Sequence, residues 1–454
     1  MSGLALDVRL DGFPEPIGSL VRTDRESLAF TYKPNYLSSQ DPVPLSISMP
    51  LTDEPFDDVP TRAFFDNLLQ ERDGALSSVM ARERLRRDDI AGLLLHLGRD
   101  CPGALSVLPV GAPPAKVPGN FALDYIALNE ARFSSIVFAL HARRPLPDGT
   151  TDPSPLAGVQ SKIALTLLPN GLFAEPRPGS GAPTTHIIKV PDRGHLRDPI
   201  HEAATLELSR KCGFVTAQAE VLNVRDLFSE LDVLVITRFD RALNENGQII
   251  RVHQEDFAQA LGLPSRLKYE RHGSSSRRFD IAGIRKVLDV TTDPAKERES
   301  FIRATLFDLL TGNVDSHAKN HALLHLGRGR ICVAPRYDLL PTRLDPQLTD
   351  ELSFRVGAAD KLAAITGADF AAFLQALGIV GAPAQRRLTK HHASSIATTI
   401  AAALSALDQN TMKAFADLIA ANMRQLLPAL GLDVPQTAQN RDAFINRGGG
   451  WLMS

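Results

Sequence analysis

The chain has 454 residues, of which 44% are hydrophobic and 22% are charged. A single core stops growing near roughly 250–300 residues, so this length predicts two or more domains, and the ordinary globular composition excludes a largely disordered protein. The net charge of −2 excludes a protein that binds nucleic acid or membrane surfaces through its overall charge.

The cysteines and the N-terminus indicate the compartment. Cys101, Cys212 and Cys332 are widely spaced and form no CxxC pair, so we expect reduced thiols and no disulfide framework or structural zinc site. Asp7 and Arg9 interrupt the apolar stretch that a signal peptide requires, and no run approaches the roughly 18 apolar residues of a membrane span. We therefore expect a cytoplasmic protein that does not contact the membrane.

The N-terminal third mixes strand and helix patterns. LALDVRL at residues 4–10 and LAFTYKP at residues 28–34 have the period of strands, and RAFFDNLLQERDGALSSVMARERL at residues 62–85 has the period of helix. A stretch rich in proline and glycine follows at residues 143–158. We place a domain boundary there and expect an N-terminal α+β subdomain over residues 1–150.

We place the next region over residues 151–255. Between residue 159 and about residue 235 it has the order strand, strand, helix, strand, in the segments KIALTLL, THIIKV, HEAATLELSRKCG and LDVLVITRF. Gly213 ends the helix, because a glycine just past a periodic segment supplies the left-handed conformation of a C-cap. This order is that of a small kinase-type N-lobe.

Helical periodicity dominates residues 256–435, with helices expected at FAQALG, at KERESFIRATLFDLLTG and in the alanine-rich part between Asp360 and Leu430. HALLHLG and RICVAPRYD read as two short strands around a Gly-Arg-Gly turn, so the polar residues beside them are expected on loops at strand ends. The tail, residues 436–454, has no clear period, and we expect it to be mobile.

One set of residues has the spacing that phosphoryl transfer requires. That reaction needs a carboxylate to orient the attacking hydroxyl, an amide and a second carboxylate to hold magnesium, and a lysine on the nucleotide phosphates. Asp315 and Asn320 have the D-x-x-x-x-N spacing of a kinase catalytic loop, and Asp338 follows 18 residues later in VAPRYDLLP. Each alone is more often a turn former or a strand-end cap, but their joint spacing favours the functional interpretation.

Lys189, at the end of THIIKV, resembles the phosphate-contacting lysine of the kinase strand pattern V-A-I-K. Glu202, 13 residues further on in the next helix, could position this lysine. Glu207 on the same helix is a rival, and a surface glutamate is the ordinary alternative for both. The loop AGVQSK, residues 157–162, could cover phosphates with its backbone, although neither a Walker loop nor G-x-G-x-x-G is present.

His317, His321 and His325 recur every four residues, which on a helix would gather three imidazoles as metal ligands. Because this stretch is predicted as a loop followed by a strand, we interpret His317 instead as a scaffold residue of the loop. Basic clusters at residues 82–87, 266–278 and 385–392 are expected to be solvated faces, since no helix-turn-helix or aromatic interleaving accompanies them.

An ordered series of blocks between about residues 63 and 341 resembles the HipA family of kinases. The blocks are FFDNLLQER, LGRDCPGALSVLP, AGVQSKIAL, THIIKVPD, HEAATLELSRKCG, TRFDR, HQEDFAQALGLPSRLKYE, LTGNVDSHAKNHALL and APRYDLLPT. HQEDFAQALG and GNVDSHAKN distinguish this family from other kinases.

The resemblance implies an α+β fold, namely a two-lobed protein-kinase-like fold with an extra N-terminal α+β subdomain and a mainly helical C-lobe. It implies an ATP- and Mg²⁺-dependent serine/threonine protein kinase that is the toxin of a toxin–antitoxin pair. The implied partners are a HipB-like helix-turn-helix antitoxin, operator DNA reached mainly through that antitoxin, and a protein substrate, such as glutamyl-tRNA synthetase or another translation component.

The resemblance also assigns roles to residues. It implies that Asp315 is the catalytic base, that Asn320 and Asp338 bind Mg²⁺, and that Lys189 binds the nucleotide phosphates. The implied nucleotide-binding residues are Gly158, Val159, Gln160, Ser161, Lys162, Lys189, Thr237, Arg238, Phe239 and His317.

The chain departs from the family pattern at two places. Thr237 stands where the hinge often carries glutamate, so adenine contacts would depend on the backbone. Pro155 stands where the family phosphorylates its own loop serine; Ser154 and Ser161 are the nearby hydroxyls, and we expect this switch to be weakened or absent.

Two other functions remain open. A pseudokinase that only supports operator binding by an antitoxin is the main rival, and a small-molecule kinase of similar fold is a third possibility. The presence of Asp315, Asn320, Asp338 and Lys189 argues against the first, and the HQEDFAQALG block argues against the second.

Overall fold

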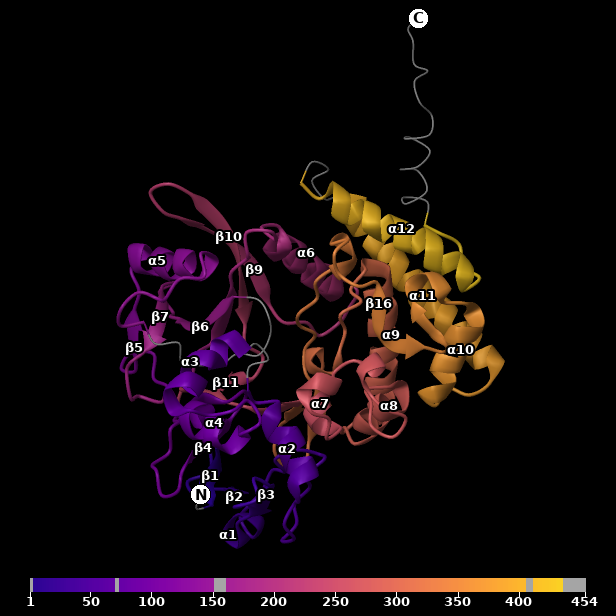
Figure 1. Ribbon diagram of the computed structural model, residues 1–454. Coiled ribbons are helices and arrows are strands. Elements are labelled where there is room, and N and C mark those ends of the chain that lie inside the picture. Colours follow the sequence, from indigo (N-terminus) through magenta and orange to yellow (C-terminus); the bar gives the residue numbers. More distant parts are fainter. Residues whose placement is uncertain (1–2, 70–72, 151–160, 406–410, 436–454) are drawn as a thin grey trace, which may run out of the picture.

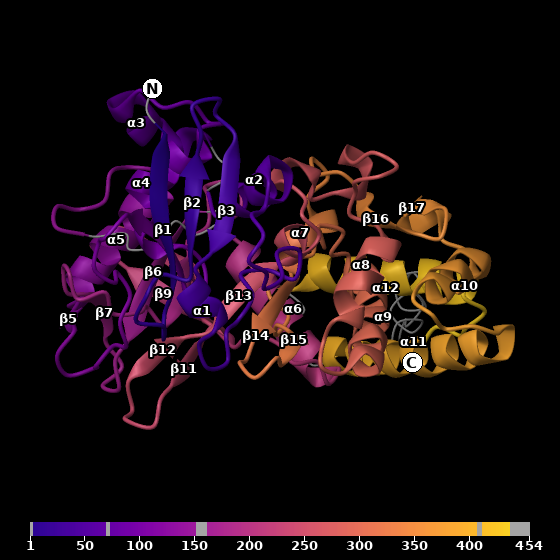
Figure 2. The same cartoon turned by 90° about the horizontal axis from the view of Figure 1, so that it is seen from below.

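The computed structural model describes residues 3–69, 73–150, 161–405 and 411–435. The molecule consists of two large sheets with their covering helices and one large, mainly helical part that carries smaller sheets (Figure 1). The N-terminal sheet lies next to the larger central sheet, and the helical part lies alongside both (Figure 2).

The N-terminal unit is a four-stranded antiparallel sheet in the order β3-β2-β1-β4, covered by helices. Its apolar face and the helices enclose a separate core that includes Phe30, Phe64 and Leu93. The elements are β1 (Leu4–Leu10), β2 (Gly18–Arg22), β3 (Leu28–Tyr32), α1 (Pro34–Leu37), α2 (Asp58–Asp66), α3 (Asp73–Glu83), α4 (Ile90–Leu97) and β4 (Leu105–Pro109).

The central sheet has six antiparallel strands in the order β5-β7-β6-β8-β10-β9. Its elements are β5 (Tyr125–Ala127), α5 (Glu130–His141), β6 (Lys162–Leu167), β7 (Phe173–Pro176), β8 (His186–Lys189), α6 (Asp198–Lys211), β9 (Ala219–Arg225) and β10 (Glu230–Thr237).

One helix covers each face of this sheet, because side chains along a strand alternate between its faces. Val233 and Val235 of β10 pack in the core that α5 helps to form. Leu234 and Ile236 point to the opposite face and pack with Ala203 of α6. The two helices therefore hold β8 and β10 from both sides and fix the positions of Lys189 and Thr237 at their ends.

The helical part holds the largest core and carries three small antiparallel sheets. Its elements are β11 (Arg241–Leu243), β12 (Ile249–Arg251), β13 (His253–Asp256), α7 (Phe257–Ala260), α8 (Ile281–Asp289), α9 (Pro294–Thr311), β14 (Ala322–His325), β15 (Ile331–Val333), β16 (Glu351–Val356), β17 (Ala359–Lys361), α10 (Gly367–Ala376), α11 (Ala382–Ser405) and α12 (Lys413–Ala429). Single 3-10 turns occur at Gly98–Asp100, Ser265–Leu267, Glu270–His272, Ala318–Asn320, Thr342–Leu344 and Leu362–Ala364.

The central helix α9 delivers the chain to residues 312–320. Asp293 caps its N-terminus by accepting a hydrogen bond from Lys296 N, and Pro294 occupies the first turn, where no donor is lost. Gly312 ends the helix with a left-handed φ of 80°, which a side chain would disfavour. Residues 301–311 are almost all buried, so the segment that follows starts from a rigid support.

Several predicted elements differ from the observed ones. The helical pattern at residues 62–85 covers two helices, α2 and α3. The predicted order of strands and helix between residues 159 and 235 omitted β7 and β9; β7 has only four residues, and β9 is a largely exposed edge strand, so neither has a clear apolar period. The predicted tail, residues 436–454, lies outside the described residues.

The break at residues 143–158 does not separate the two sheets. β5 and α5 precede it, yet β5 is the edge strand of the central sheet and α5 packs on its face. We therefore propose a domain boundary between β4 and β5, ahead of the one predicted at residue 150. In the ranges that the structure covers, no helix combines the length and the apolar character that crossing a membrane requires.

Candidate functional site

A cavity of about 720 Å³ opens between the central sheet and the helical part. Strands β6, β8 and β10 line one side, and the segments 315–320 and 337–348 line the other. Asn67 and Pro102 extend the lining to the N-terminal unit. Of the residues predicted for the site, the cavity lining includes Lys162, Lys189, Thr237, Arg238, Phe239, Asp315, His317, Asn320 and Asp338.

Lys189 is the charged centre of the cavity wall. Its Nζ donates to Glu202 Oε1 at 2.6 Å and to Asp338 Oδ1 at 2.5 Å. Burial opposes the charge of the amine, but Asp338 and Glu202 outweigh burial and hold the pKa of Lys189 above its ordinary value. The rival Glu207 is half exposed and pairs with Arg210 instead.

Glu202 is only 1% exposed, whereas 44% of the Asp338 side chain is exposed to the cavity and solvent. Burial raises the pKa of Glu202, and Lys189 offsets part of this effect. For Asp338, Lys189 and Lys162 overcome the effect of burial and hold its pKa below the ordinary value. Lys162 lies opposite Lys189 in the register of β6 and β8, so two cations face the same carboxylate.

Asp338 has a φ of 56°, in the left-handed region that residues other than glycine rarely adopt. Such a backbone persists where surrounding contacts hold it, and sites of function are a common place for it. Here the turn directs the carboxylate from the end of segment 331–338 toward β8.

Asp315 and Asn320 lie on the opposite wall. Asn320 Nδ2 donates to the backbone oxygen of Asp315 at 2.7 Å, which closes the loop between them. Tyr269 Oη donates to Asp315 Oδ1 at 2.6 Å. Burial raises the pKa of the Asp315 carboxyl, and the hydrogen bond from Tyr269 counteracts part of this rise.

Asp308, near the end of α9, stabilises segment 312–320. The carboxylate of Asp308 forms an ion pair with Arg336 and accepts from Ser316 Oγ at 3.2 Å, and its backbone oxygen accepts from Asn313 N at 3.0 Å. Burial raises the pKa of Asp308, which Arg336 partly offsets. One buried acid thus joins both chain segments that carry the site's carboxylates.

Lys319 also stabilises segment 312–320. Its Nζ donates to Asp256 Oδ2 at 2.7 Å and to the backbone and side-chain oxygens of Asn67 at 3.2 and 3.1 Å. Asn67 is the C-cap residue of α2, so the N-terminal unit contacts this segment directly. Lys319 and Asn67 are 252 positions apart, and no sequence pattern pointed to their contact.

The side chains of His317, His321 and His325 lie in different surroundings. His321 packs among phenylalanine rings, His325 contacts Glu255 at 2.9 Å, and His317 lines the cavity. Burial lowers the pKa of His317 to about 3, so its imidazole is neutral at physiological pH. Over residues 3–69, 73–150, 161–405 and 411–435, no group of three His, Cys, Asp or Glu side chains is arranged to hold a metal.

The donors suit Mg²⁺ bound together with phosphates, which takes one or two carboxylates and keeps its other positions for water and phosphate oxygens. Asp338 uses Oδ1 for Lys189, and Asn320 uses its amide nitrogen for Asp315. In the described part of the chain, nothing hydrogen-bonds to Asp338 Oδ2 or to Asn320 Oδ1. Both oxygens belong to residues that line the cavity.

At the hinge, residues 237–239, fewer groups are available to contact a nucleotide than the sequence predicted. The guanidinium of Arg238 is buried and paired with Asp240 at 2.9 Å, so it cannot serve a ligand. The backbone nitrogens of Thr237 and Arg238 donate to Gln218 O and Thr185 O. Within the described residues, the backbone nitrogen of Phe239 makes no hydrogen bond, so it can donate one to a bound ligand.

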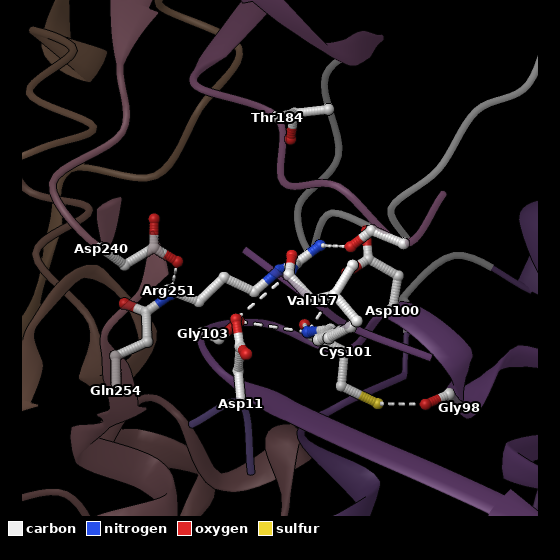
Figure 3. A network of polar contacts seen from close by, with 12 residues as sticks. Asp11, Gly98, Asp100, Cys101, Gly103, Val117, Thr184, Asp240, Arg251 and Gln254 are labelled. Atoms are coloured by element: carbon white, nitrogen blue, oxygen red, sulfur yellow. Dashed lines mark hydrogen bonds and ion pairs between the residues drawn. The ribbon is translucent and has the colours of Figure 1, made fainter. Parts of the chain in front are cut away.

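Behind the hinge, a buried polar network connects the N-terminal unit to strand β12 (Figure 3). Arg251 contacts Asp11 at 3.3 Å, and Gln254 donates to Asp240 at 3.2 Å. Lys116 pairs with Asp100 at 3.1 Å and donates to the backbone oxygens of Cys101 and Gly103. The hinge therefore rests on charges contributed by both units.

Several residues predicted for the nucleotide loop are not among the described residues. Gly158, Val159 and Gln160 lie outside the described residues, as do Ser154 and Pro155. Ser161 precedes β6 and its backbone oxygen accepts from Val190 N at 2.9 Å.

Family models match an N-terminal and a C-terminal part of the chain. The model of the HipA-like C-terminal domain matches residues 154–409, and that of the HipA N-terminal domain matches residues 6–108. The Sinorhizobium fredii protein Y4mE is 32% identical over 425 residues, which covers 92% of this chain and 98% of Y4mE. The serine/threonine-protein kinase toxin HipA of Shewanella oneidensis is 27% identical over 332 residues, 70% of this chain and 71% of that protein.

A solved structure has the same overall fold. A chain of the Shewanella oneidensis complex of HipA, HipB and operator DNA matches with a TM-score of 0.75 and 23% identity, covering 96% of this chain and 99% of that chain. The predicted fold class is confirmed: α+β, two-lobed and protein-kinase-like, with an extra N-terminal subdomain and a mainly helical C-lobe.

Proposed function

This chain belongs to the HipA family, and we propose that it is an ATP-dependent serine/threonine protein kinase that acts as the toxin of a toxin–antitoxin pair. The observation that carries the proposal is the meeting of Lys189 with Glu202 and Asp338 in the cavity that Asp315 and Asn320 also line. A lysine, a helix carboxylate, a base and two oxygen ligands are the parts that phosphoryl transfer needs.

In the proposed reaction, Asp315 orients a serine or threonine hydroxyl and receives its proton. The hydroxyl oxygen bonds to the γ-phosphorus of ATP as the bond from that phosphorus to the bridging oxygen of ADP breaks. Lys189 and Lys162 attract the phosphate charge, and Phe239 faces the adenine with its backbone. Positioning and electrostatics supply most of the rate, because this chemistry needs little covalent help.

Asn320 and Asp338 hold Mg²⁺ in this proposal. When bound, the ion neutralises charge that develops on the phosphates. The direct contact between Lys189 and Asp338 then has to loosen, so that the carboxylate serves the metal and the amine serves the phosphates. The exposed part of Asp338 leaves room for that exchange.

The biological role follows from the family. A relative is named a kinase toxin, and the structural neighbour is a complex with HipB and operator DNA. We propose a HipB-like helix-turn-helix antitoxin as the partner of this chain, with operator DNA contacted mainly through it. The proposed substrate is a cytoplasmic protein, glutamyl-tRNA synthetase or another translation component, whose phosphorylation arrests growth.

Phosphate transfer to protein in the presence of ATP and Mg²⁺ tests the activity. Asp315→Asn and Lys189→Ala should each lose at least about a hundredfold in rate, because each removes a charge that acts in the transition state. Asp232→Asn is the matched control, since that carboxylate lies on β10 and contacts Asn223 on the surface. Transfer at the wild-type rate by Asp315→Asn would overturn the proposal.

Growth separates the kinase from the pseudokinase rival. Expression of the wild-type chain alone should slow growth, Asp315→Asn should not, and co-expression of a neighbouring helix-turn-helix protein should restore growth. Equal arrest by the wild type and Asp315→Asn would favour a module that acts through binding alone.

A further inference from the structure

The side chain of Asp315 is held by one residue, Tyr269, to which the family resemblance assigned no role. The backbone of Asp315 is fixed on both sides: its nitrogen donates to Asn313 Oδ1 at 3.2 Å, and its oxygen accepts from His317 N at 2.9 Å. The carboxylate has a different partner, since Oδ1 accepts from Tyr269 Oη at 2.6 Å. Among the described residues, no hydrogen bond reaches Oδ2.

The ring of Tyr269 is itself held in place. The guanidinium of Arg271 lies 4.1 Å from the ring centroid, and the rings of His317 and His272 meet it edge-on at 5.0 and 5.3 Å. The same segment is tied to the loop by a hydrogen bond from Ala318 N to Lys268 O at 3.0 Å. Cation–π and edge-on ring contacts of this kind restrain both the position and the tilt of the ring.

A phenol held this way can play one of two parts. It can occupy the place of the acceptor hydroxyl and block it, or it can hold one carboxylate oxygen so that the other is left for the acceptor. The second fits the geometry better, because the ring is fixed from three sides while Asp315 keeps an oxygen without a described partner. A base that must meet a hydroxyl within hydrogen-bond reach benefits from a fixed rotamer.

We infer that Tyr269 is a positioning residue for Asp315: its hydroxyl holds Oδ1, sets the carboxylate plane and leaves Oδ2 to orient the acceptor serine or threonine. This inference rests on the proposed kinase function. Tyr269 keeps its own proton throughout, and the acceptor proton passes to Oδ2.

Tyr269→Phe tests the inference, because it removes the hydroxyl and keeps the ring that packs with Arg271 and His317. We expect kcat to fall roughly tenfold to a hundredfold, as for a lost hydrogen bond to a charged group, with KM for ATP unchanged. A loss confined to kcat, with KM for ATP and the melting temperature unchanged, is a result that a general loss of structure would not give. Tyr36→Phe is the matched control: its hydroxyl donates to Val43 O at 2.6 Å in the N-terminal unit, away from the cavity.

Asp315→Asn in the same assay separates the two proposals. If it keeps wild-type transfer, the proposed function fails and the role of Tyr269 fails with it. If it is inactive while Tyr269→Phe keeps the wild-type kcat, only the role of Tyr269 is overturned. A faster Tyr269→Phe would also overturn it and would identify the phenol as a block on the acceptor site.

Discussion

Lys189 contacts two carboxylates at once, and the two differ in burial. Glu202 is enclosed, so it is suited to fix the amine, whereas Asp338 is half exposed and can exchange the amine for another cation. Losing one partner of a buried pair is costly, because the other charge is left without compensation.

Glu202→Gln should therefore raise KM for ATP by roughly tenfold and lower kcat less, because Lys189 loses its fixed position. Glu207→Gln, on the same helix but exposed and paired with Arg210, serves as the control and should match the wild type. Steady-state kinetics with varied ATP measure both. Equal behaviour of the two variants would show that Glu202 does not position the lysine.

The loop before β6 raises a second question at the scale of single residues. Pro155 has no hydroxyl, and Pro153 and Pro155 restrict the backbone on both sides of Ser154. We expect little or no phosphate on this loop after incubation with ATP and Mg²⁺. Mass spectrometry of the wild type, Ser154→Ala and Ser161→Ala measures it. Stoichiometric phosphate on Ser154, with activity falling as it accumulates, would show that the switch is intact.

At the scale of elements, α2 does more than cover the N-terminal sheet. It lies between that sheet and α7 (Figure 2), and its C-cap residue Asn67 accepts from Lys319. Asn67 also donates to Leu263 O at 2.8 Å, just beyond α7. The extra N-terminal subdomain is thus a support of segment 312–320 as well as a separate unit.

Asn67→Ala should lower kcat roughly threefold to tenfold, since Lys319 keeps only Asp256 and the backbone oxygen of residue 67. The free energy of unfolding should fall by about 1–3 kcal/mol, because buried partners lose their hydrogen bonds. Asn223→Ala on exposed β9 is the control. Reduced stability with unchanged kcat would mean that α2 supports the fold and not the segment.

At the scale of the whole molecule, the N-terminal unit contacts strand β12 across the buried network of Figure 3. Lys116 lies inside it, only 5% exposed, and burial lowers the pKa of its amine to about 8, with Asp100 opposing this shift. In the unfolded chain the amine has its ordinary pKa of 10.5. Above about pH 8 the unfolded state therefore holds the proton more often than the folded state does.

Stability then rises with pH in this window, because the folded protein no longer has to bury a charged amine. From about pH 7.5 to about pH 9, Lys116 should add about 1 kcal/mol to the free energy of unfolding. Urea unfolding of the wild type and Lys116→Met at both pH values measures the difference between their slopes. Parallel slopes would contradict the lowered pKa.

The sequence alone determined the parts of the site that depend on short spacing. Asp315, Asn320 and Asp338 could be predicted because their spacings of five and 18 positions match the kinase pattern. Long helices such as α9 and α11, with 18 and 24 residues, could be predicted because an uninterrupted helical pattern of that length is distinctive.

Only the tertiary structure decided which distant groups meet. It showed that Glu202 and not Glu207 pairs with Lys189, and that the guanidinium of Arg238 pairs with Asp240. It also brought Tyr269 and Asn67 to segment 312–320. It also assigned β5 to the central sheet across the proline-rich break. These contacts join residues up to 252 positions apart. They arise when separate cores pack against each other, and no local pattern of hydrophobic and polar residues records that packing.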